Sequence, residues 1–101
     1  MSEAKQRLDK WLWFARFAKT RSLAAKLVAG GHVRVNGARA TNAAKAVRVG
    51  DVLTIAAPHG TAVVRILAEG TRRGPAPEAA GLYEALGERD TGALVSDGRD
   101  D

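Results

Sequence analysis

The sequence predicts an α+β domain in which two N-terminal helices pack as a corner on a small, mostly antiparallel sheet, with another helix near the C-terminus. Three observations predict this class. Apolar residues recur at helical spacing in residues 7–29, alternating apolar segments separated by glycine turns follow in residues 32–67, and a proline precedes a last helical pattern. At 101 residues the chain suffices for one domain with a small core.

The first helix is predicted over residues 7–17. At 100° per residue its main apolar face and margin contain Leu8, Trp11, Leu12, Phe14, Ala15 and Ala18. A second aromatic pair, Trp13 and Phe17, falls on nearly the opposite side. This pair could stack on nucleic-acid bases, or a later segment of the chain could cover it. We favour burial, because aromatic residues at helical spacing more often belong to a core than to a ligand site.

The second helix is predicted to begin after Thr20, whose hydroxyl suits an N-cap, and to stop at Gly30-Gly31. Its expected apolar face contains Leu23, Ala24, Leu27 and Val28. A strand with Val33 and Val35 on one side follows. Asn36-Gly37 then tolerates the positive φ angles that a tight hairpin turn requires.

After this turn the sequence predicts further short strands. Residues 38–40 form the return strand, residues 41–46 a loop, and Gly50-Asp51 a turn into a strand ending at Ile55. Another turn at residues 58–60 leads into a strand over residues 62–67. The two histidines are expected to be a turn residue and a solvent-facing strand residue, since they lie far apart in the chain without nearby carboxylates.

The C-terminal part is predicted to support the domain. Residues 70–77 read as a linker with exposed Arg72 and Arg73, and Pro77 is suited to open a helix over residues 78–86. The apolar side of that helix, Leu82, Tyr83 and Leu86, is expected to cover Trp13 and Phe17. The predicted boundaries are therefore a domain at 5–69, the linker and packed helix at 70–88, and a disordered acidic tail at 89–101.

Charge is distributed unevenly along the chain. The net charge is +5, but residues 1–50 hold eleven Lys and Arg against two carboxylates, whereas residues 51–101 hold five against nine. No carboxylate occurs between Asp9 and Asp51, an interval with nine basic residues. A surface that serves only solubility normally mixes its signs, so this block indicates a polyanionic partner.

The start of the second helix is the most specific candidate site. A helix N-terminus normally favours Asp or Glu, yet here Lys19 and Arg21 stand beside the hydroxyls of Thr20 and Ser22. A phosphate would satisfy these cations, the hydroxyls and the free backbone N–H groups together. The alternative is a solvated surface helix whose basic residues serve only solubility.

Several classes of function are not expected. The chain has no cysteine, no paired carboxylates on a patterned element, no phosphate-binding glycine loop and no histidine beside a candidate nucleophile, so we expect neither an enzyme nor a metal or cofactor. Asp51 is expected to stabilise the turn that it forms with Gly50 and not to be catalytic. No apolar run approaches the length of a membrane span and no signal-peptide pattern is present, so a cytoplasmic protein without membrane partners is expected.

Four motifs together resemble the S4-type RNA-binding domain (alpha-L fold). They are R-L-D-K-W-L at 7–12, K-T-R-S-L-A at 19–24, G-x-V-R-V-N-G at 31–37 and V-x-V-G-D-V-L at 47–53. The aromatic W-L-W-F-A-R-F at 11–17 and R-R-G-P-A-P-E-A-x-x-L-Y-E at 72–84 are similar to the bacterial heat-shock protein 15 family, whose members bind the free large ribosomal subunit. The resemblance extends over about residues 5–86.

The resemblance implies an RNA-binding surface at the helix corner. Carried over position by position, it contains Arg7, Lys10, Lys19, Thr20, Arg21, Ser22, Lys26, Arg34, Asn36 and Lys45. Asp9 is implied to orient basic side chains or to pair within the fold. The implied partners are ribosomal RNA of the free large subunit and a tRNA-linked nascent chain, in stress-related ribosome rescue or recycling.

The expected function is thus non-enzymatic binding of structured RNA by a monomer. Shape and phosphate contacts suit folded RNA, and no helix is evident that would read bases in a DNA groove. The alternatives are a general nucleic-acid binder with weak DNA affinity, a ribosome-assembly factor, or a protein-interaction module that uses an exposed Trp13 and Phe17.

Overall fold

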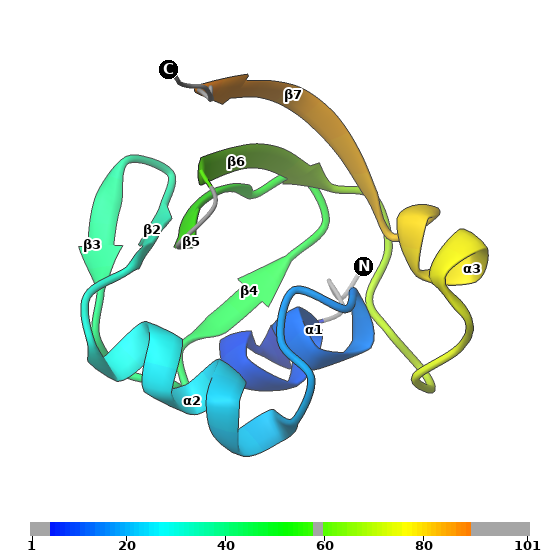
Figure 1. The fold of residues 1–101 in the computed structure, drawn as a ribbon, viewed down its shortest axis with the longest axis horizontal. Helices are drawn as coiled ribbons and strands as arrows, with labels where there is room; N and C mark the ends of the chain where they lie inside the picture. The colour runs from blue at the N-terminus through cyan, green and yellow to red at the C-terminus, as the bar shows by residue number, and fades with distance from the viewer. Residues whose placement is uncertain (1–4, 58–59, 90–101) are drawn as a thin grey trace.

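The computed structural model describes residues 5–57 and 60–89. Its elements are β1 (Lys5–Arg7), α1 (Leu8–Phe14), α2 (Arg21–Ala29), β2 (Val33–Val35), β3 (Ala38–Ala40), β4 (Ala46–Arg48), β5 (Val52–Ala57), β6 (Gly60–Ile66), α3 (Ala76–Ala80) and β7 (Tyr83–Arg89). Figure 1 shows α1 and α2 together on one side of the molecule, with the main sheet on the other. The predicted α+β class with an antiparallel sheet is confirmed.

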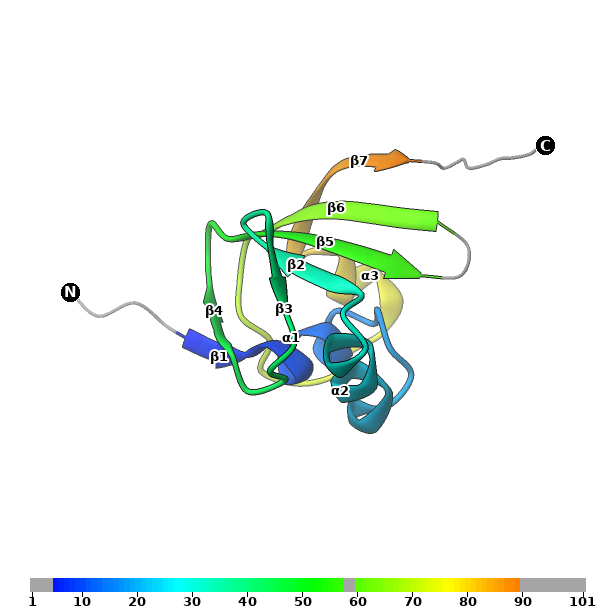
Figure 2. The same ribbon diagram turned by 90° about the vertical axis from the view of Figure 1, so that its left-hand side faces the viewer.

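The main sheet has five strands in the order β3-β2-β5-β6-β7, and every neighbouring pair is antiparallel. β1 pairs separately with β4. In Figure 2 the sheet forms one layer with the two N-terminal helices beneath it. Alternate residues of β2, β5 and β6 are buried and join the helices in one core: Val33, Val35, Leu53, Ile55, Val64 and Ile66.

Helix α1 buries the apolar face that its periodicity predicts, with Leu8, Trp11 and Leu12 fully inaccessible to solvent. The helix ends at Phe14 rather than at Phe17, so its predicted length is wrong. The cause is Arg16, whose φ of 67° leaves the helical region.

Helix α2 has the predicted ends. The Thr20 hydroxyl oxygen accepts a hydrogen bond from the Leu23 N–H at 3.1 Å, and Gly30 caps the C-terminus before Gly31 turns the chain with a φ of 82°. Its apolar face is narrower than predicted. Ala24 and Val28 are buried, but Leu23 is 44% exposed, so the predicted face is buried only in part.

The hairpin between β2 and β3 is confirmed. Asn36 and Gly37 have φ angles of 52° and 88°, the pair of positive values that a two-residue hairpin turn needs. Asp51 holds the neighbouring turn, since its carboxylate accepts hydrogen bonds from the Arg48 N–H and from the Asn36 side-chain amide, both at 3.1 Å. Of the turn predicted at 58–60, residues 58 and 59 lie outside the described residues.

Side chains of β1, of α1 and of the turn after α1 bind backbone groups of the segment between β6 and α3. The side-chain amide of Gln6 both donates to the Gly70 carbonyl at 2.8 Å and accepts from the Gly70 N–H at 2.9 Å. The Trp11 indole donates to the Ala68 carbonyl at 3.0 Å, and Arg16 Nε donates to the Gly74 carbonyl at 2.8 Å. These bonds make the segment part of the domain and not a free linker.

Arg73 reinforces this attachment. Its Nε donates to the Trp13 carbonyl at 3.1 Å, its guanidinium lies 5.9 Å from the centroid of the Trp13 ring, and the residue is half-buried. The prediction of two exposed arginines is therefore wrong for Arg73. Arg72 is exposed, as predicted, and forms an ion pair with Glu78 at 2.6 Å.

The predicted helix over residues 78–86 is wrong in extent. Helix α3 ends at Ala80, and residues 83–89 form β7 along β6, including residue 89, the first residue of the predicted tail. Good helix formers are drawn into a strand here because β6 offers unpaired backbone groups at the sheet edge. The remaining tail, residues 90–101, lies outside the described residues.

The second aromatic pair of α1 is partly covered, but not by a helix face. Tyr83, at the start of β7, packs on Phe17 with ring centroids 5.0 Å apart, and Arg73 lies over Trp13. Both aromatic residues remain half-buried against the core. Leu86, expected to join this cover, is 41% exposed because it is the unpaired residue at a bulge opposite Val63 and Val64.

Candidate nucleic-acid interface

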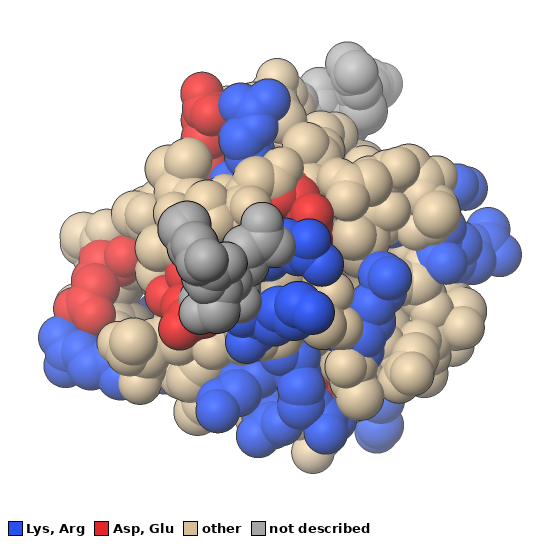
Figure 3. All heavy atoms as spheres, turned by 180° about the vertical axis from the view of Figure 1, so that it is seen from behind, with Lys and Arg blue, Asp and Glu red and all other residues tan. Residues whose placement is uncertain are grey.

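Basic side chains gather on the helical side of the molecule. Figure 3 shows Lys and Arg spread across the lower half of the rear face, the half in which Figure 1 places α1 and α2. The predicted residues around this corner come from short neighbouring segments: Arg7, Lys10, Lys19, Thr20, Arg21, Ser22 and Lys26. All except Lys10, which is half-buried, are exposed.

Asp9 organises the two arginines of this corner. Its side chain is only 5% exposed, and it receives two hydrogen bonds from Arg7, from Nε to Oδ1 at 3.1 Å and from Nη2 to Oδ2 at 3.2 Å. Arg21 Nε, from the first turn of α2, lies 3.7 Å from the same carboxylate. One buried acid thus brings an arginine before α1 and an arginine of α2 to one point.

The charge balance at this point remains positive. The hydrogen bond from Arg7 to Asp9, followed by the attraction between their charges, raises the pKa of the Arg7 guanidinium above its ordinary value. Two guanidinium groups share a single carboxylate, and both arginine side chains stay about half exposed, at 51% and 44%. The outward edges of both guanidiniums can therefore bind an anion in solvent.

The N-terminus of α2 adds donors without charge. Within the described part of the chain, the backbone N–H groups of Arg21 and Ser22 have no protein acceptor, and the nine-residue helix directs its positive end toward them. The Thr20 oxygen accepts the capping bond, and its hydroxyl proton is still available to a ligand. This arrangement of free N–H groups, hydroxyls and arginines suits a phosphate.

The remaining predicted site residues are two lysines at the edge of this corner and a group on the hairpin of β2 and β3. Lys10 is on α1 with its ammonium 5.8 Å from the Phe14 ring centroid, a cation–π contact, and Lys26 is an exposed residue of α2. Arg34 is on β2, beyond the opposite end of α2, and donates to the Gly37 carbonyl at 3.3 Å. The structure thus separates the predicted residues into a helix corner and a hairpin group.

Asn36 has a structural role in the hairpin group. Its side-chain amide donates to Asp51 at 3.1 Å and its oxygen accepts from the Val52 N–H at 2.9 Å, so both polar ends are occupied within the fold. Lys45 lies in the loop before β4, along a groove of about 400 Å³ that Asn36 and Arg39 also line. An RNA contact by Asn36 or Lys45 stays a prediction.

Arg39 is the basic residue of this groove that the sequence-based site leaves out. The sequence places it outward on the return strand but gives no sign of its neighbour, because strand register is needed to identify cross-strand partners. In the structure Arg39 is exposed and stands directly opposite Arg34.

Two other kinds of site are not found in the described residues. No group of three or more His, Asp or Glu side chains in residues 5–57 and 60–89 is placed to hold a metal ion. Among the same residues, no helix has both the length and the apolar character needed to cross a membrane.

Comparisons with known proteins identify close relatives. The S4 domain family matches residues 6–53. The chain is 45% identical over 82 residues to Heat shock protein 15 of Escherichia coli (strain K12), an alignment that covers 81% of this chain and 61% of that protein. The chain thus spans less than two thirds of the length of this curated relative.

Two further comparisons concern a solved structure and a ribosomal protein. A structure of Heat Shock Protein 15 from Vibrio cholerae, described as trimeric, superposes with a TM-score of 0.77 and 44% identity, covering 82% of this chain and 83% of that one. Small ribosomal subunit protein uS4 of Fusobacterium nucleatum is 39% identical over 51 residues, which are 50% of this chain and 26% of that protein.

Proposed function

The chain belongs to the heat shock protein 15 family of S4-domain proteins, and from this we propose that it is an RNA-binding protein that recognises structured RNA. The observation that carries the proposal is the corner where Asp9 holds Arg7 and Arg21 beside the open N-terminus of α2. The backbone N–H groups of a helix N-terminus and arginine guanidiniums are both donors that bind phosphate well. Phosphates of a folded RNA are the ligand that this chemistry fits.

RNA is preferred to duplex DNA for a structural reason. Helix α2 presents its positive end, and not a row of base-reading side chains, to the solvent, so contacts to phosphates and to RNA shape are expected to dominate. A general nucleic-acid binder remains the second candidate, since phosphate contacts alone discriminate backbones weakly. Competition between structured RNA and duplex DNA at one salt concentration separates the two candidates. Duplex DNA should fail to displace structured RNA from an RNA-specific protein but should displace it from a general nucleic-acid binder.

Binding is expected to depend strongly on salt. If about five to seven phosphates are contacted, a plot of log affinity against log salt concentration should have a slope of roughly −4 to −6. Fluorescence anisotropy of a labelled structured RNA, titrated between about 50 and 200 mM salt, measures it. A slope near zero would mean that phosphate contacts do not drive the interaction.

For the cellular target we propose ribosomal RNA of the free large subunit, with its tRNA-linked nascent chain, in stress-related ribosome rescue or recycling in the cytoplasm. The family resemblance supports this target. The relatives named for heat shock and for the small ribosomal subunit support an association with ribosomes, and neither name specifies the large subunit. A ribosome-assembly factor is the alternative. The chain is proposed to act by binding and not by catalysis. A monomer stays a prediction, and the Vibrio cholerae relative is described as a trimer.

A further inference from the structure

The hairpin of β2 and β3 places two arginines side by side. Arg34 and Arg39 are direct partners in the antiparallel register, one position away from the pair that flanks the two-residue turn. Pairs at this position do not exchange backbone hydrogen bonds, and their side chains approach more closely than those of hydrogen-bonded pairs. Like charges directly opposite each other destabilise a sheet.

The same sheet pairs an arginine differently elsewhere. Arg65 on β6 faces Glu84 on β7 in register, and the two side chains form an ion pair at 3.0 Å. Cross-strand pairs of opposite charge are the stabilising choice. The arginine pair of the hairpin therefore departs from what sheet stability favours, although the chain makes the favoured pairing on the same sheet.

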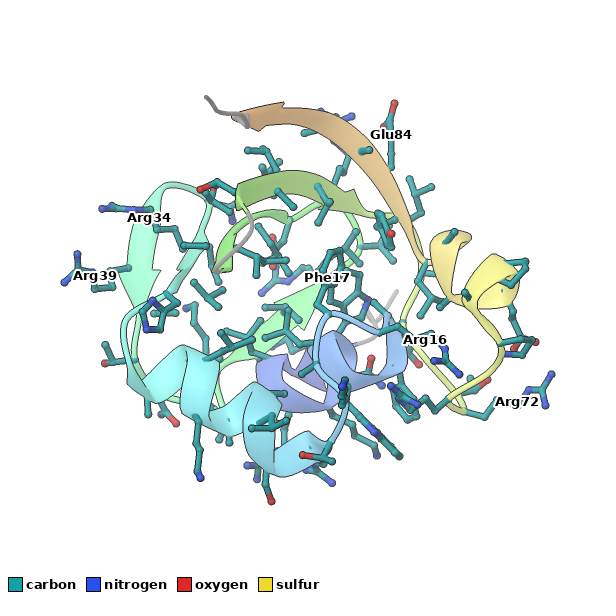
Figure 4. All side chains as sticks on the ribbon, viewed as in Figure 1. Arg16, Phe17, Arg34, Arg39, Arg72 and Glu84 are labelled. Atoms are coloured by element: carbon teal, nitrogen blue, oxygen red, sulfur yellow. The ribbon has the colours of Figure 1, made fainter. Side chains whose placement is uncertain are left out.

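Nothing in the described residues neutralises the hairpin pair. Arg34 donates only to the Gly37 carbonyl, and neither arginine forms an ion pair with a carboxylate within residues 5–57 and 60–89. The aliphatic part of the Arg39 side chain lies against Gly31: a Cβ added to Gly31 would be 3.4 Å from the Cδ of Arg39. Figure 4 shows both side chains projecting from the hairpin into solvent on the same side.

We propose that Arg34 and Arg39 form a second phosphate-binding site, which contacts the same RNA that binds at the N-terminus of α2. This inference rests on the proposed function. Two adjacent guanidiniums offer paired donors to one phosphate, and an anion between them turns their repulsion into attraction. The groove that Arg39 and Lys45 line extends this positive surface along β3.

The two sites are close enough for one RNA. They lie toward opposite ends of α2, whose nine residues extend about 13 Å. A folded RNA that places a phosphate at the helix N-terminus can therefore place another at the hairpin. This arrangement predicts an RNA that wraps around α2 and not one that touches a single point.

The test measures RNA affinity and thermal stability in the same variant. Arg39→Gln should weaken binding of a structured RNA about tenfold and make the salt slope shallower by about one. Without RNA, its melting temperature at low salt should rise by about 1 to 5 °C, because the repulsion is removed. Arg65→Gln is the matched control: it removes one exposed arginine charge from the same sheet and should leave RNA affinity within about twofold.

The outcomes separate this inference from the proposed function. If wild-type protein binds no structured RNA, the proposed function itself fails. If the wild type binds and Arg39→Gln binds as tightly as Arg65→Gln, the second site is wrong while the helix-corner site stands. Arg39→Lys, which keeps the charge, should recover most of the affinity that the glutamine loses. A lower melting temperature for Arg39→Gln would also contradict the inference, since it would give Arg39 a structural role.

Discussion

Gly70→Ala is expected to lower the free energy of unfolding by about 3 kcal/mol and the melting temperature by about 12 °C or more. A Cβ at this position would lie 2.4 Å from the Cβ and 2.5 Å from the ring of Phe14, which is only 5% exposed. Neither atom belongs to a flexible side-chain end, so the backbone would have to shift. That shift would also disturb the paired hydrogen bonds between Gly70 and Gln6.

Gly87→Ala provides the matched control in a thermal or urea unfolding experiment. A Cβ at Gly87, on β7, would meet no described atom within 4 Å, and its φ is not positive. Its stability should stay within about 0.5 kcal/mol of the wild type. If both alanine variants unfolded at the same temperature, the close attachment of the segment at Gly70 to α1 would be wrong.

Arg21→Gln is expected to weaken RNA binding about tenfold and to make the salt slope shallower by about one. The glutamine keeps most of the side-chain length but removes the guanidinium that Asp9 positions at the start of α2. With glutamate at this position, a loss of RNA affinity would be harder to interpret, because a second carboxylate would lie against the buried Asp9. The change in stability should be small, about 1 kcal/mol or less, since the ion pair is half exposed and 3.7 Å long.

Arg65→Gln is again a close control for this variant. Arg21 and Arg65 have side-chain exposures of 44% and 45% and each lies near one carboxylate, but Arg65 is on β6. Filter binding or anisotropy with one structured RNA at fixed salt compares them. Equal affinities of the two variants would show that only net charge matters and that the corner at Asp9 is not the site.

Local signals predicted the N-terminal half of the fold well. The Thr20 cap, the stop at Gly30 and the positive φ angles at Asn36-Gly37 depend on residues adjacent in sequence, and the structure confirms each of them. Helix α1 ends three residues before its predicted end at residue 17, and the periodicity of the sequence could not predict this. Arg16 leaves the helical region where its side chain binds the carbonyl of Gly74, a residue far along the chain.

The C-terminal half shows where such signals fail. Residues 83–89 have helical composition, but pairing with β6 decides their structure. The sequence predicts Arg73 as an exposed linker residue. Its hydrogen-bond acceptors, the carbonyls of Trp13 and Ala18, are distant in sequence, so local signals could not identify them.

The candidate site was predictable in part. Charge and the family resemblance located Arg7 and Arg21, and the geometry of Asp9 agrees with the role that the resemblance implied. The importance of Arg39 could not be predicted, because it depends on which residue the hairpin register places opposite it.

Sedimentation of the tagged full chain through a sucrose gradient tests the central claim most directly, since it asks which RNA particle the protein binds in a lysate. We predict that the wild type moves with free large ribosomal subunits at low salt and is released as salt rises, and that Arg21→Gln is released at lower salt than Arg65→Gln. Wild-type protein that stayed at the top of the gradient, free of ribosomal RNA even at low salt, would contradict the ribosomal function proposed for this surface.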